Sequence, residues 1–393
     1  MGEVWGWMLM QILYLDYAAA TPMAPEVIEA MAPYWSELFY NPSAPYAAAR
    51  GVRHDLDAAK ARLAHVIGAR PGNVTITAGA TEANNLAFAA VDGPVLVCAI
   101  EHESVLACAE AHGGRVVAVN SDGIIDLEAL RELLTADVEL VSVGLANGEI
   151  GCIQPLREIA KLVRGERMRR LEQGSAVPLL LHTDASQAAG QVSVNVSSLG
   201  ADLMTLSAAK VYGPKQVGLL WHADGVALHP LVRGGGQEGG IRSGTENVAG
   251  VIGFARALEL AEELRPGQTR RLRALSARLC RGLAQAVPDV VFSGPKRASR
   301  RLPGLVHASF PGVEARRLVV ALEREGVCVG TGSACAASRM QVSHVLRAIG
   351  LPDEVAQGSL RISLGRGTTE ADVDRAVEAI AAAVRAEHER KGK

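Results

Sequence analysis

The stretch from Ala201 to Leu220, ADLMTLSAAKVYGPKQVGLL, decides the fold that the sequence predicts. An apolar run ends at Ser207, and Lys210 follows it among small residues. A glycine–proline pair typical of a turn comes next, and a second apolar run extends from Val217 to Trp221. We therefore expect Lys210 in a short connection between two strands, where its small neighbours leave room for a ligand.

Polar residues also follow other apolar runs along the chain. His182-Thr183-Asp184 ends the run from Pro178, Glu101-His102-Glu103-Ser104 follows Val95 to Ile100, and Asn147-Gly148-Glu149 follows Glu139 to Leu145. Segments with helical periodicity alternate with these runs. This alternation predicts an α/β fold with a mostly parallel sheet, in which ligand-binding groups gather beyond the carboxyl ends of the strands.

A further strand pattern, Asn73 to Thr77, leads through small residues into a helix that opens with Thr81 and Glu82. The free N–H groups of such a helix start favour an anion, often a phosphate. An ordinary helix N-terminus has the same composition, so this segment alone leaves both interpretations open.

The length of 393 residues is enough for two domains. We predict a large ligand-binding domain over residues 21–265 and a smaller α+β domain over residues 266–393, which residues 1–20 join. The boundary is placed at Arg265-Pro266-Gly267, a predicted break in a long helical region. The charged segment from Val163 to Val177 is expected to be a surface insertion.

Composition excludes several classes of function. Hydrophobic residues make up 49% of the chain, the formal net charge is −2 and aromatics are only 4%, which argues against disorder, a nucleic-acid partner and an anionic membrane surface. The apolar N-terminal residues contain no Lys or Arg and are too few to span a bilayer. The six cysteines form no CxxC pair or zinc-site spacing, so we expect no metal site and a reducing cytoplasm.

A lysine, an aspartate, a histidine and a phosphate cradle together form the set that pyridoxal phosphate requires. Lysine forms a Schiff base with it, and an acid keeps its ring nitrogen protonated so that the ring acts as an electron sink. The chain then resembles the pyridoxal-phosphate-dependent cysteine desulfurases of the NifS/IscS type, within the fold type I aminotransferase superfamily. The resemblance extends from about Leu13 to the last helix and rests on the motifs LDYAAATP, AGATEANNLA, EHESVL, IGCIQPL, HTDASQAAG, SAAKVYGPKQVG, GGGQEGGIRSGTEN, GTGSACAAS and RISLGRGTT.

The resemblance implies roles for residues around the cofactor ring. Lys210 would hold the cofactor and move the α-proton of the substrate. Asp184 would pair with the ring nitrogen, His102 would stack on the ring and exchange protons, and Gln187 would bond to the phenolic oxygen.

The resemblance also implies how phosphate and substrate are bound. Ala80, Thr81 and Ser207 would cradle the phosphate, and Thr245 would reach in from the other subunit of a homodimer. Arg361 would bind the substrate carboxylate, for which a guanidinium fork is suited.

Cys335 is the expected nucleophile, carried by the small domain in a glycine-rich stretch, residues 330–338, that is typical of a mobile loop. The implied reaction takes sulfur from L-cysteine, gives L-alanine and leaves a persulfide on Cys335. The sulfur would pass to an acceptor protein, such as an iron–sulfur scaffold or a tRNA-thiolation protein.

The chain departs from the family pattern at two positions. Gly148 stands where the family usually has a second asparagine that reaches cofactor and substrate, so we expect Asn147 to substitute for it or the contact to be missing. Ala209 replaces the histidine that often precedes the lysine. The alternatives are a selenocysteine lyase, a small-amino-acid aminotransferase, and a weakly active scaffold subunit that binds the cofactor.

Overall fold

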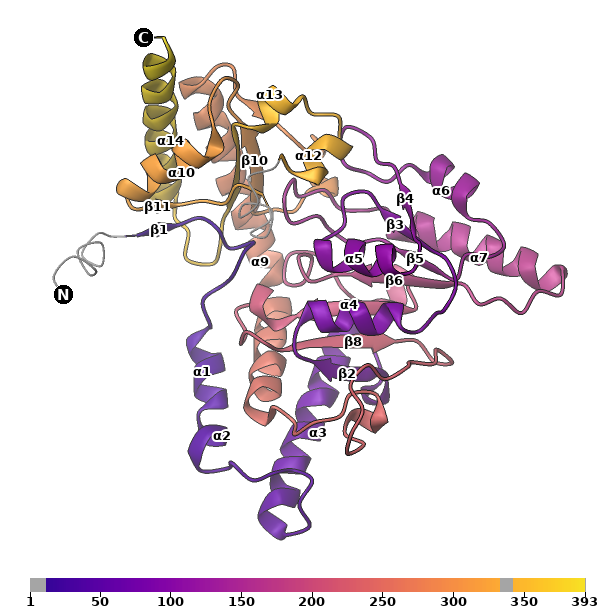
Figure 1. Ribbon diagram of the computed structural model, residues 1–393. Helices are drawn as coiled ribbons and strands as arrows, with labels where there is room; N and C mark the ends of the chain where they lie inside the picture. The colour runs from indigo at the N-terminus through magenta and orange to yellow at the C-terminus, as the bar shows by residue number, and fades with distance from the viewer. Residues whose placement is uncertain (1–11, 333–341, 393) are drawn as a thin grey trace.

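The computed structural model describes residues 12–332 and 342–392, and within them the central feature is a seven-stranded sheet of order β2-β8-β7-β6-β5-β3-β4 (Figure 1). β8 runs antiparallel to both of its neighbours, and the remaining neighbours pair in parallel. The predicted α/β fold class with a mostly parallel sheet is therefore confirmed. Its strands are β2 (Val74–Thr77), β3 (Val95–Cys98), β4 (Arg115–Val117), β5 (Leu140–Ser142), β6 (Leu180–Asp184), β7 (Leu203–Ser207) and β8 (Gly218–His222).

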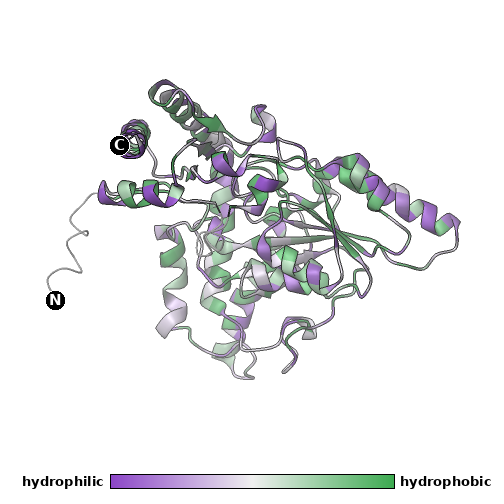
Figure 2. Cartoon of the chain, turned by 45° about the horizontal axis from the view of Figure 1, so that its top comes forward, coloured by the Kyte–Doolittle hydropathy of each residue, from purple (hydrophilic) through white to green (hydrophobic). Residues whose placement is uncertain are grey.

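These strands form from apolar runs without polar alternation because the sheet is buried on both faces. Every residue of β2, β3, β5 and β7 is buried. Figure 2 shows the central strands as largely hydrophobic, whereas the helices around them carry both hydrophilic and hydrophobic residues. The helices of this part are α1 (Pro25–Met31), α2 (Pro33–Ser36), α3 (Ala47–Ile67), α4 (Ala80–Phe88), α5 (Glu103–Ala111), α6 (Leu127–Leu133), α7 (Leu156–Glu172), α8 (Val196–Leu199) and α9 (Val248–Ala286).

A smaller part packs beside the sheet and contains both the first described strand and the last helix (Figure 1). Strand β1 pairs in parallel with β11, and β10 lies between β9 and β12 in an antiparallel sheet. Its elements are β1 (Leu13–Tyr14), β9 (Val291–Phe292), β10 (Leu305–Ser309), α10 (Ala315–Arg324), β11 (Val327–Cys328), α12 (His344–Ala348), α13 (Asp353–Ala356), β12 (Ser359–Ser363) and α14 (Glu370–Lys391). In the described part of the chain, no helix is long and apolar enough to cross a membrane.

Helix α9 joins the two parts, and the break predicted at Arg265-Pro266-Gly267 is wrong. The helix continues through Pro266 to Ala286. Proline costs a helix one backbone hydrogen bond, about 3 kcal/mol in an exposed interior. Packing on both sides offsets this cost, because Leu260 lies in the core of the large part and Leu272 in the core of the small part. We propose that the domain boundary still falls near residue 265, inside an unbroken helix.

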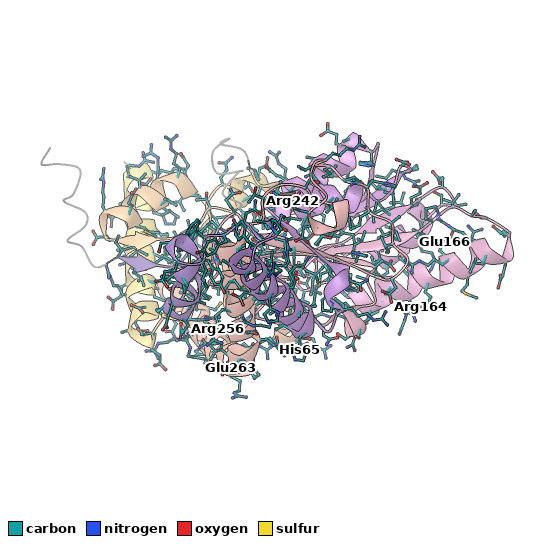
Figure 3. The ribbon with its side chains drawn as sticks, turned by 90° about the horizontal axis from the view of Figure 1, so that it is seen from below. His65, Arg164, Glu166, Arg242, Arg256 and Glu263 are labelled. Atoms are coloured by element: carbon teal, nitrogen blue, oxygen red, sulfur yellow. The ribbon has the colours of Figure 1, made fainter. Side chains whose placement is uncertain are left out.

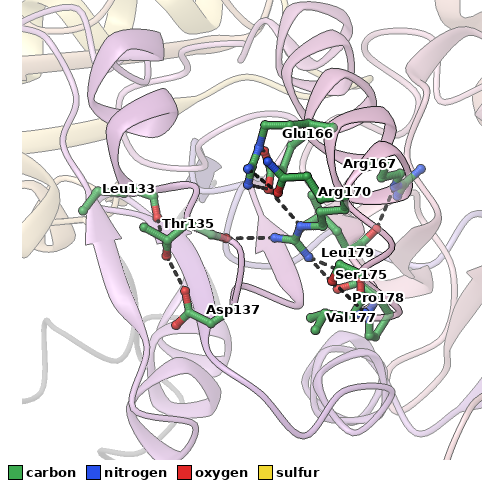
Figure 4. A network of polar contacts seen from close by, with 12 residues as sticks. Leu133, Thr135, Asp137, Glu166, Arg167, Arg170, Ser175, Val177, Pro178 and Leu179 are labelled. Atoms are coloured by element: carbon green, nitrogen blue, oxygen red, sulfur yellow. Dashed lines mark hydrogen bonds and ion pairs between the residues drawn. The ribbon is translucent and has the colours of Figure 1, made fainter.

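Helix α7 contains most of the charged segment that was predicted from the sequence to be a surface insertion. The C-terminal end of the helix is held by Arg170, which is only 2% exposed (Figure 4). The Arg170 guanidinium donates to Glu166 at 2.9 Å, to the Thr135 carbonyl at 2.8 Å and to the Pro178 carbonyl at 3.0 Å. A charged residue in this segment therefore serves as an internal anchor, while Gln173 and its neighbours are exposed.

Candidate active site

A cavity of about 340 Å³ opens at the carboxyl ends of the central strands. Loops that follow β3, β5, β6 and β7 contribute to its wall, as expected for an α/β sheet. It brings together residues that the sequence placed far apart, namely Ala80, Thr81, His102, Asn147, Asp184, Gln187, Ser207, Lys210 and Arg361.

Lys210 ends a short 3-10 turn, Ala208–Lys210, between β7 and β8, as the sequence predicted. Its Nζ donates to the carbonyl oxygens of Ala18 at 2.8 Å and Ala19 at 2.7 Å. These carbonyls belong to the N-terminal LDYAAATP motif, so that motif helps to position the amine. Ser207, at the end of β7, is buried beside it in the same cavity wall.

The first turn of α4 points its backbone toward the same cavity. Gly79 precedes the helix with φ at 127°, a value that favours glycine, and Ala80 and Thr81 line the cavity. The first N–H groups of a helix have no intrahelical acceptor and attract anions. Glu82, the acid of this turn, is paired with Arg242 at 2.9 Å, and Arg242 is labelled in Figure 3. The pairing compensates the one negative side chain of the turn, which suits a phosphate.

Asp184 and His102 come from different elements of the cavity wall. Asp184 ends β6, and His102 lies just before α5. The Asp184 carboxylate accepts from the Asn84 amide at 3.0 Å and from the Ser186 N–H at 2.9 Å. His102 caps α5, with its Nδ1 accepting from the Ser104 N–H at 3.1 Å. The ring of His102 is exposed to the cavity side of the structure, where a planar ligand could stack on it.

Glu101 is a titratable residue of the cavity to which sequence reasoning assigned no role. It is buried, and its Oε1 accepts from the Gly144 N–H at 2.8 Å. Burial raises its pKa from 4.5 to about 8, and the nearby charge of Asp184 acts in the same direction. The carboxyl group is thus mostly protonated at neutral pH. Its position at a strand end beside His102 was the signal that could have identified it.

Glu101→Gln should remove a pH dependence of the free energy of unfolding. Because folding raises the pKa of Glu101, the contribution of this residue to stability is fully present below about pH 4.5 and is lost as pH rises through about 8. Linkage limits the loss to roughly 5 kcal/mol. Urea unfolding at pH 5 and pH 9 should therefore show Glu101→Gln gaining several kcal/mol on the unmodified chain at the higher pH. Exposed Glu110 on α5 provides the control, since Glu110→Gln should gain nothing; equal pH profiles for Glu101→Gln and the unmodified chain would contradict the shift.

Asn147 is held in its own turn rather than replacing the missing asparagine. Its Nδ2 donates to the Ile100 carbonyl at 2.9 Å, and its Oδ1 accepts from the N–H groups of Glu149 and Ile150, both at 2.9 Å. Next to it, a β-carbon on Gly148 would lie only 2.8 Å from the side chain of Gln187.

The Gln187 side chain therefore occupies the space that a side chain at position 148 would need. Its Nε2 donates at 3.0 Å to the Ala18 carbonyl, which also accepts from Lys210. Ala209, the other departure from the family pattern, lines the same cavity.

Arg361, on β12, reaches the cavity from the small part and is already paired there. Its Nη2 contacts the Asp16 carboxylate at 2.7 Å, and its Nη1 donates to the Gly148 carbonyl at 3.2 Å. The Nε is buried and has no hydrogen-bond acceptor among the described residues. The guanidinium is therefore held by Asp16 and the Gly148 carbonyl, and it lines the cavity in which a ligand carboxylate could accept from it.

Comparisons with known proteins agree with this site. The aminotransferase class-V family matches residues 13–376. The chain belongs to that family. A cysteine desulfurase IscS of Clostridium botulinum is 39% identical over 380 residues, covering 94% of this chain and 93% of its own. A solved NifS-like protein is 30% identical with a TM-score of 0.86, covering 95% of this chain and 100% of its own. SspA, solved in complex with cysteine, is 29% identical with a TM-score of 0.72, covering 89% and 98%. The resemblance predicted from the motifs is confirmed.

As a member of the aminotransferase class-V family, the chain uses pyridoxal phosphate, and the donor set of the cavity fits this cofactor. Lys210 supplies an amine and Asp184 a carboxylate with a donor on each oxygen. The first turn of α4 supplies N–H groups for a phosphate. All three line one cavity, so the cofactor needs no rearrangement of the sheet to be held.

Two of the site residues predicted from the sequence are not among the described residues that line this cavity. Thr245 lines a separate cavity of about 220 Å³ with Arg242. Cys335 lies outside the described residues, in 333–341. The described residues that flank it do meet the cavity: Gly330 exchanges backbone hydrogen bonds with Arg361, and His344 lines the cavity wall.

Proposed function

We propose that this protein removes sulfur from L-cysteine, releases L-alanine and takes the sulfur onto Cys335 as a persulfide. The convergence of Lys210, Asp184 and the start of α4 on one cavity carries the proposal. Relatives from Clostridium botulinum and Archaeoglobus fulgidus, 39% and 38% identical, are named as cysteine desulfurases, and one solved relative is in complex with cysteine. The chain is a pyridoxal-phosphate-dependent cysteine desulfurase.

The cofactor, when bound, supplies an electron sink for negative charge at the substrate α-carbon. Lys210 would hold it and would carry the proton removed from that carbon. Asp184, whose carboxylate oxygens accept from Asn84 and from the Ser186 N–H, would pair with the ring nitrogen. His102 would stack on the ring, and Gln187 would bond to the phenolic oxygen.

The remaining residues of the cavity bind the phosphate and the substrate. Thr81 with the N–H groups of Ala80 and its neighbours, and Ser207 at the end of β7, hold the phosphate. Arg361, which lines the cavity, would bind the substrate carboxylate with its guanidinium. Asn147 would stabilise the part of the cavity wall that the substrate contacts, through its hydrogen bond to the Ile100 carbonyl.

The sulfur transfer itself is assigned to Cys335. Its thiolate attacks the substrate sulfur, so an S–S bond forms as the C–S bond breaks, and the electron pair of that bond passes to the carbon skeleton. That carbon is then protonated to give alanine. Gly332 and Ser343, described residues that lie close to residues 333–341 in sequence, are both near Glu149 in the cavity wall, and this supports the assignment.

The functional unit is proposed to be a homodimer in the reducing cytoplasm that hands sulfur to an acceptor protein. Thr245 would then serve the phosphate site of the second subunit, since it lies outside the cavity of its own chain. Large apolar side chains are exposed at Trp35, Phe39 and Tyr46, which suits an interface. The described cysteines are all free thiols, as in a reducing compartment.

Alanine release and sulfur mass on Cys335 test the proposed function directly. Cofactor-loaded protein is given L-cysteine without reductant, alanine is quantified, and Cys335 is examined by mass spectrometry for one added sulfur. Cys335→Ala should lower alanine formation roughly 10³-fold, because none of the described cysteines lines the cavity to accept the sulfur in its place. Cys280→Ala, at a half-buried cysteine of α9, is the control and should retain activity.

The alternatives give different results in the same assay. An aminotransferase would keep its activity in Cys335→Ala and consume an acceptor keto acid. A selenocysteine lyase would release alanine from selenocysteine while leaving L-cysteine almost untouched. A scaffold subunit would bind the cofactor and produce no alanine from either substrate.

A further inference from the structure

Asn84 is a buried amide that none of the proposed roles uses. It lies on α4 with an exposed fraction of 0%, and its Nδ2 donates both to the Asp184 carboxylate at 3.0 Å and to the Ser104 hydroxyl at 2.9 Å. The Ser104 hydroxyl is in turn 2.9 Å from His102 Nδ1. One continuous network therefore joins the acid below the cofactor site to the histidine beside it.

The direction of each hydrogen bond follows from the chemistry of the groups. An ionised carboxylate only accepts, so Asn84 must present its nitrogen to Asp184. The second amide hydrogen then goes to the Ser104 oxygen, which leaves the Ser104 hydrogen for His102 Nδ1. Asp184 thus sets which way the Asn84 amide faces, and Ser104 accepts the second amide hydrogen.

The orientation of Asn84 leaves its Oδ1 buried without a hydrogen-bond partner among the described residues. A buried amide oxygen without a donor is unfavourable, and native proteins contain few. Turning the amide over would place that oxygen against the Asp184 carboxylate, which is worse. The arrangement is therefore explained by the need for a donor at Asp184, and packing alone does not require it. Neighbouring Asn85 is exposed and bonds only locally, to the Thr81 carbonyl.

We propose that Asn84 is the positioning residue for Asp184: with its amide also bonded to Ser104, it holds the carboxylate aimed at the position that the ring nitrogen of the cofactor would occupy. This inference rests on the proposed function, in which Asp184 pairs with that nitrogen. Asn84 itself touches neither substrate nor cofactor and acts through Asp184. The Ser186 N–H holds the other carboxylate oxygen, so removal of Asn84 frees one side of the acid.

Cofactor binding to the full-length protein, stripped and then reconstituted, tests the inference with two probes. One is pyridoxal phosphate, and the other is its deaza analogue, in which C–H replaces the ring nitrogen and no bond to Asp184 can form. Asn84→Leu keeps the branching and the number of side-chain heavy atoms and removes the amide. We expect it to weaken binding of pyridoxal phosphate about tenfold to a hundredfold and binding of the deaza analogue less than about threefold. Asn85→Leu is the matched control and should change neither.

Ser104→Ala keeps the inference testable if Asn84→Leu fails to fold. Removing the anchor should shift binding in the same selective way, by about threefold or more for pyridoxal phosphate alone. Parallel weakening of both probes by Asn84→Leu, or no selective effect of Ser104→Ala, would mean that Asn84 only packs α4 and would overturn the inference. An unmodified protein that binds the two probes equally well would instead refute the proposed role of Asp184, which is a different failure.

Discussion

Lys210→Ala should lower the rate of alanine formation from L-cysteine roughly 10³-fold, because one amine both holds the cofactor and carries the α-proton. In the structure that amine sits between β7 and β8 and donates to the Ala18 and Ala19 carbonyls. No other residue type can reproduce the covalent link. Steady-state alanine release measures the loss, and mass spectrometry after borohydride reduction should find the cofactor attached to Lys210 in the unmodified protein and to no residue in the variant.

Lys215 is the matched control for this prediction. It lies in the same connection, is exposed, and donates to the Thr21 carbonyl at 2.9 Å. Lys215→Ala should keep its attached cofactor and nearly all of its activity. Added methylamine should restore a measurable part of the proton transfer to Lys210→Ala, but not to a protein that has simply unfolded. Retained activity in Lys210→Ala, with cofactor still attached elsewhere, would show that another lysine performs the role.

Local patterns in the sequence were sufficient to predict the strands that build the cavity. Continuous apolar runs identified β3, β5, β6 and β7, and the polar residues that follow them, such as His102 and Asp184, lie in the cavity wall. This succeeds because parallel strands bring their carboxyl ends to one edge whatever lies between them in sequence. The helix start at Thr81 was ambiguous alone, and its position in the cavity wall is what favours a phosphate.

Long-range pairings were beyond what local patterns contain. Asp16 and Arg361 stand 345 positions apart and meet in the structure, and Asn84 meets Asp184 across 100 positions. The continuity of α9 was missed for a related reason: the cost of Pro266 is local, whereas the packing of Leu260 and Leu272 that offsets it comes from two separate cores. Sequence reasoning found the residues of the chemistry more readily than those that hold them in place.

Arg361→Ala should raise the KM for L-cysteine roughly 10²-fold or more while lowering kcat less, because a substrate carboxylate is bound in the ground state and the transition state alike. The structure offers the geometry for this: Arg361 lines the cavity, and the Asp16 carboxylate holds its Nη2 at 2.7 Å. Asp16→Asn should also raise KM, by a smaller factor, since the guanidinium loses its charged anchor. Steady-state kinetics over a range of cysteine concentrations measures both.

Arg361→Ala should also lower the free energy of unfolding, and this loss, compared with the KM, distinguishes a role in substrate binding from a purely structural role. Arg361 is 5% exposed at its side chain, so its removal leaves Asp16 and the Gly148 carbonyl without their donor, a loss of about 3 kcal/mol in urea unfolding. Arg347, in an exposed pair with Asp353, is the control: Arg347→Ala should cost less than about 1 kcal/mol and leave KM unchanged. If Arg361→Ala loses stability while its KM stays that of the unmodified protein, then Arg361 serves Asp16 alone, and the substrate carboxylate must be bound by another residue of the cavity.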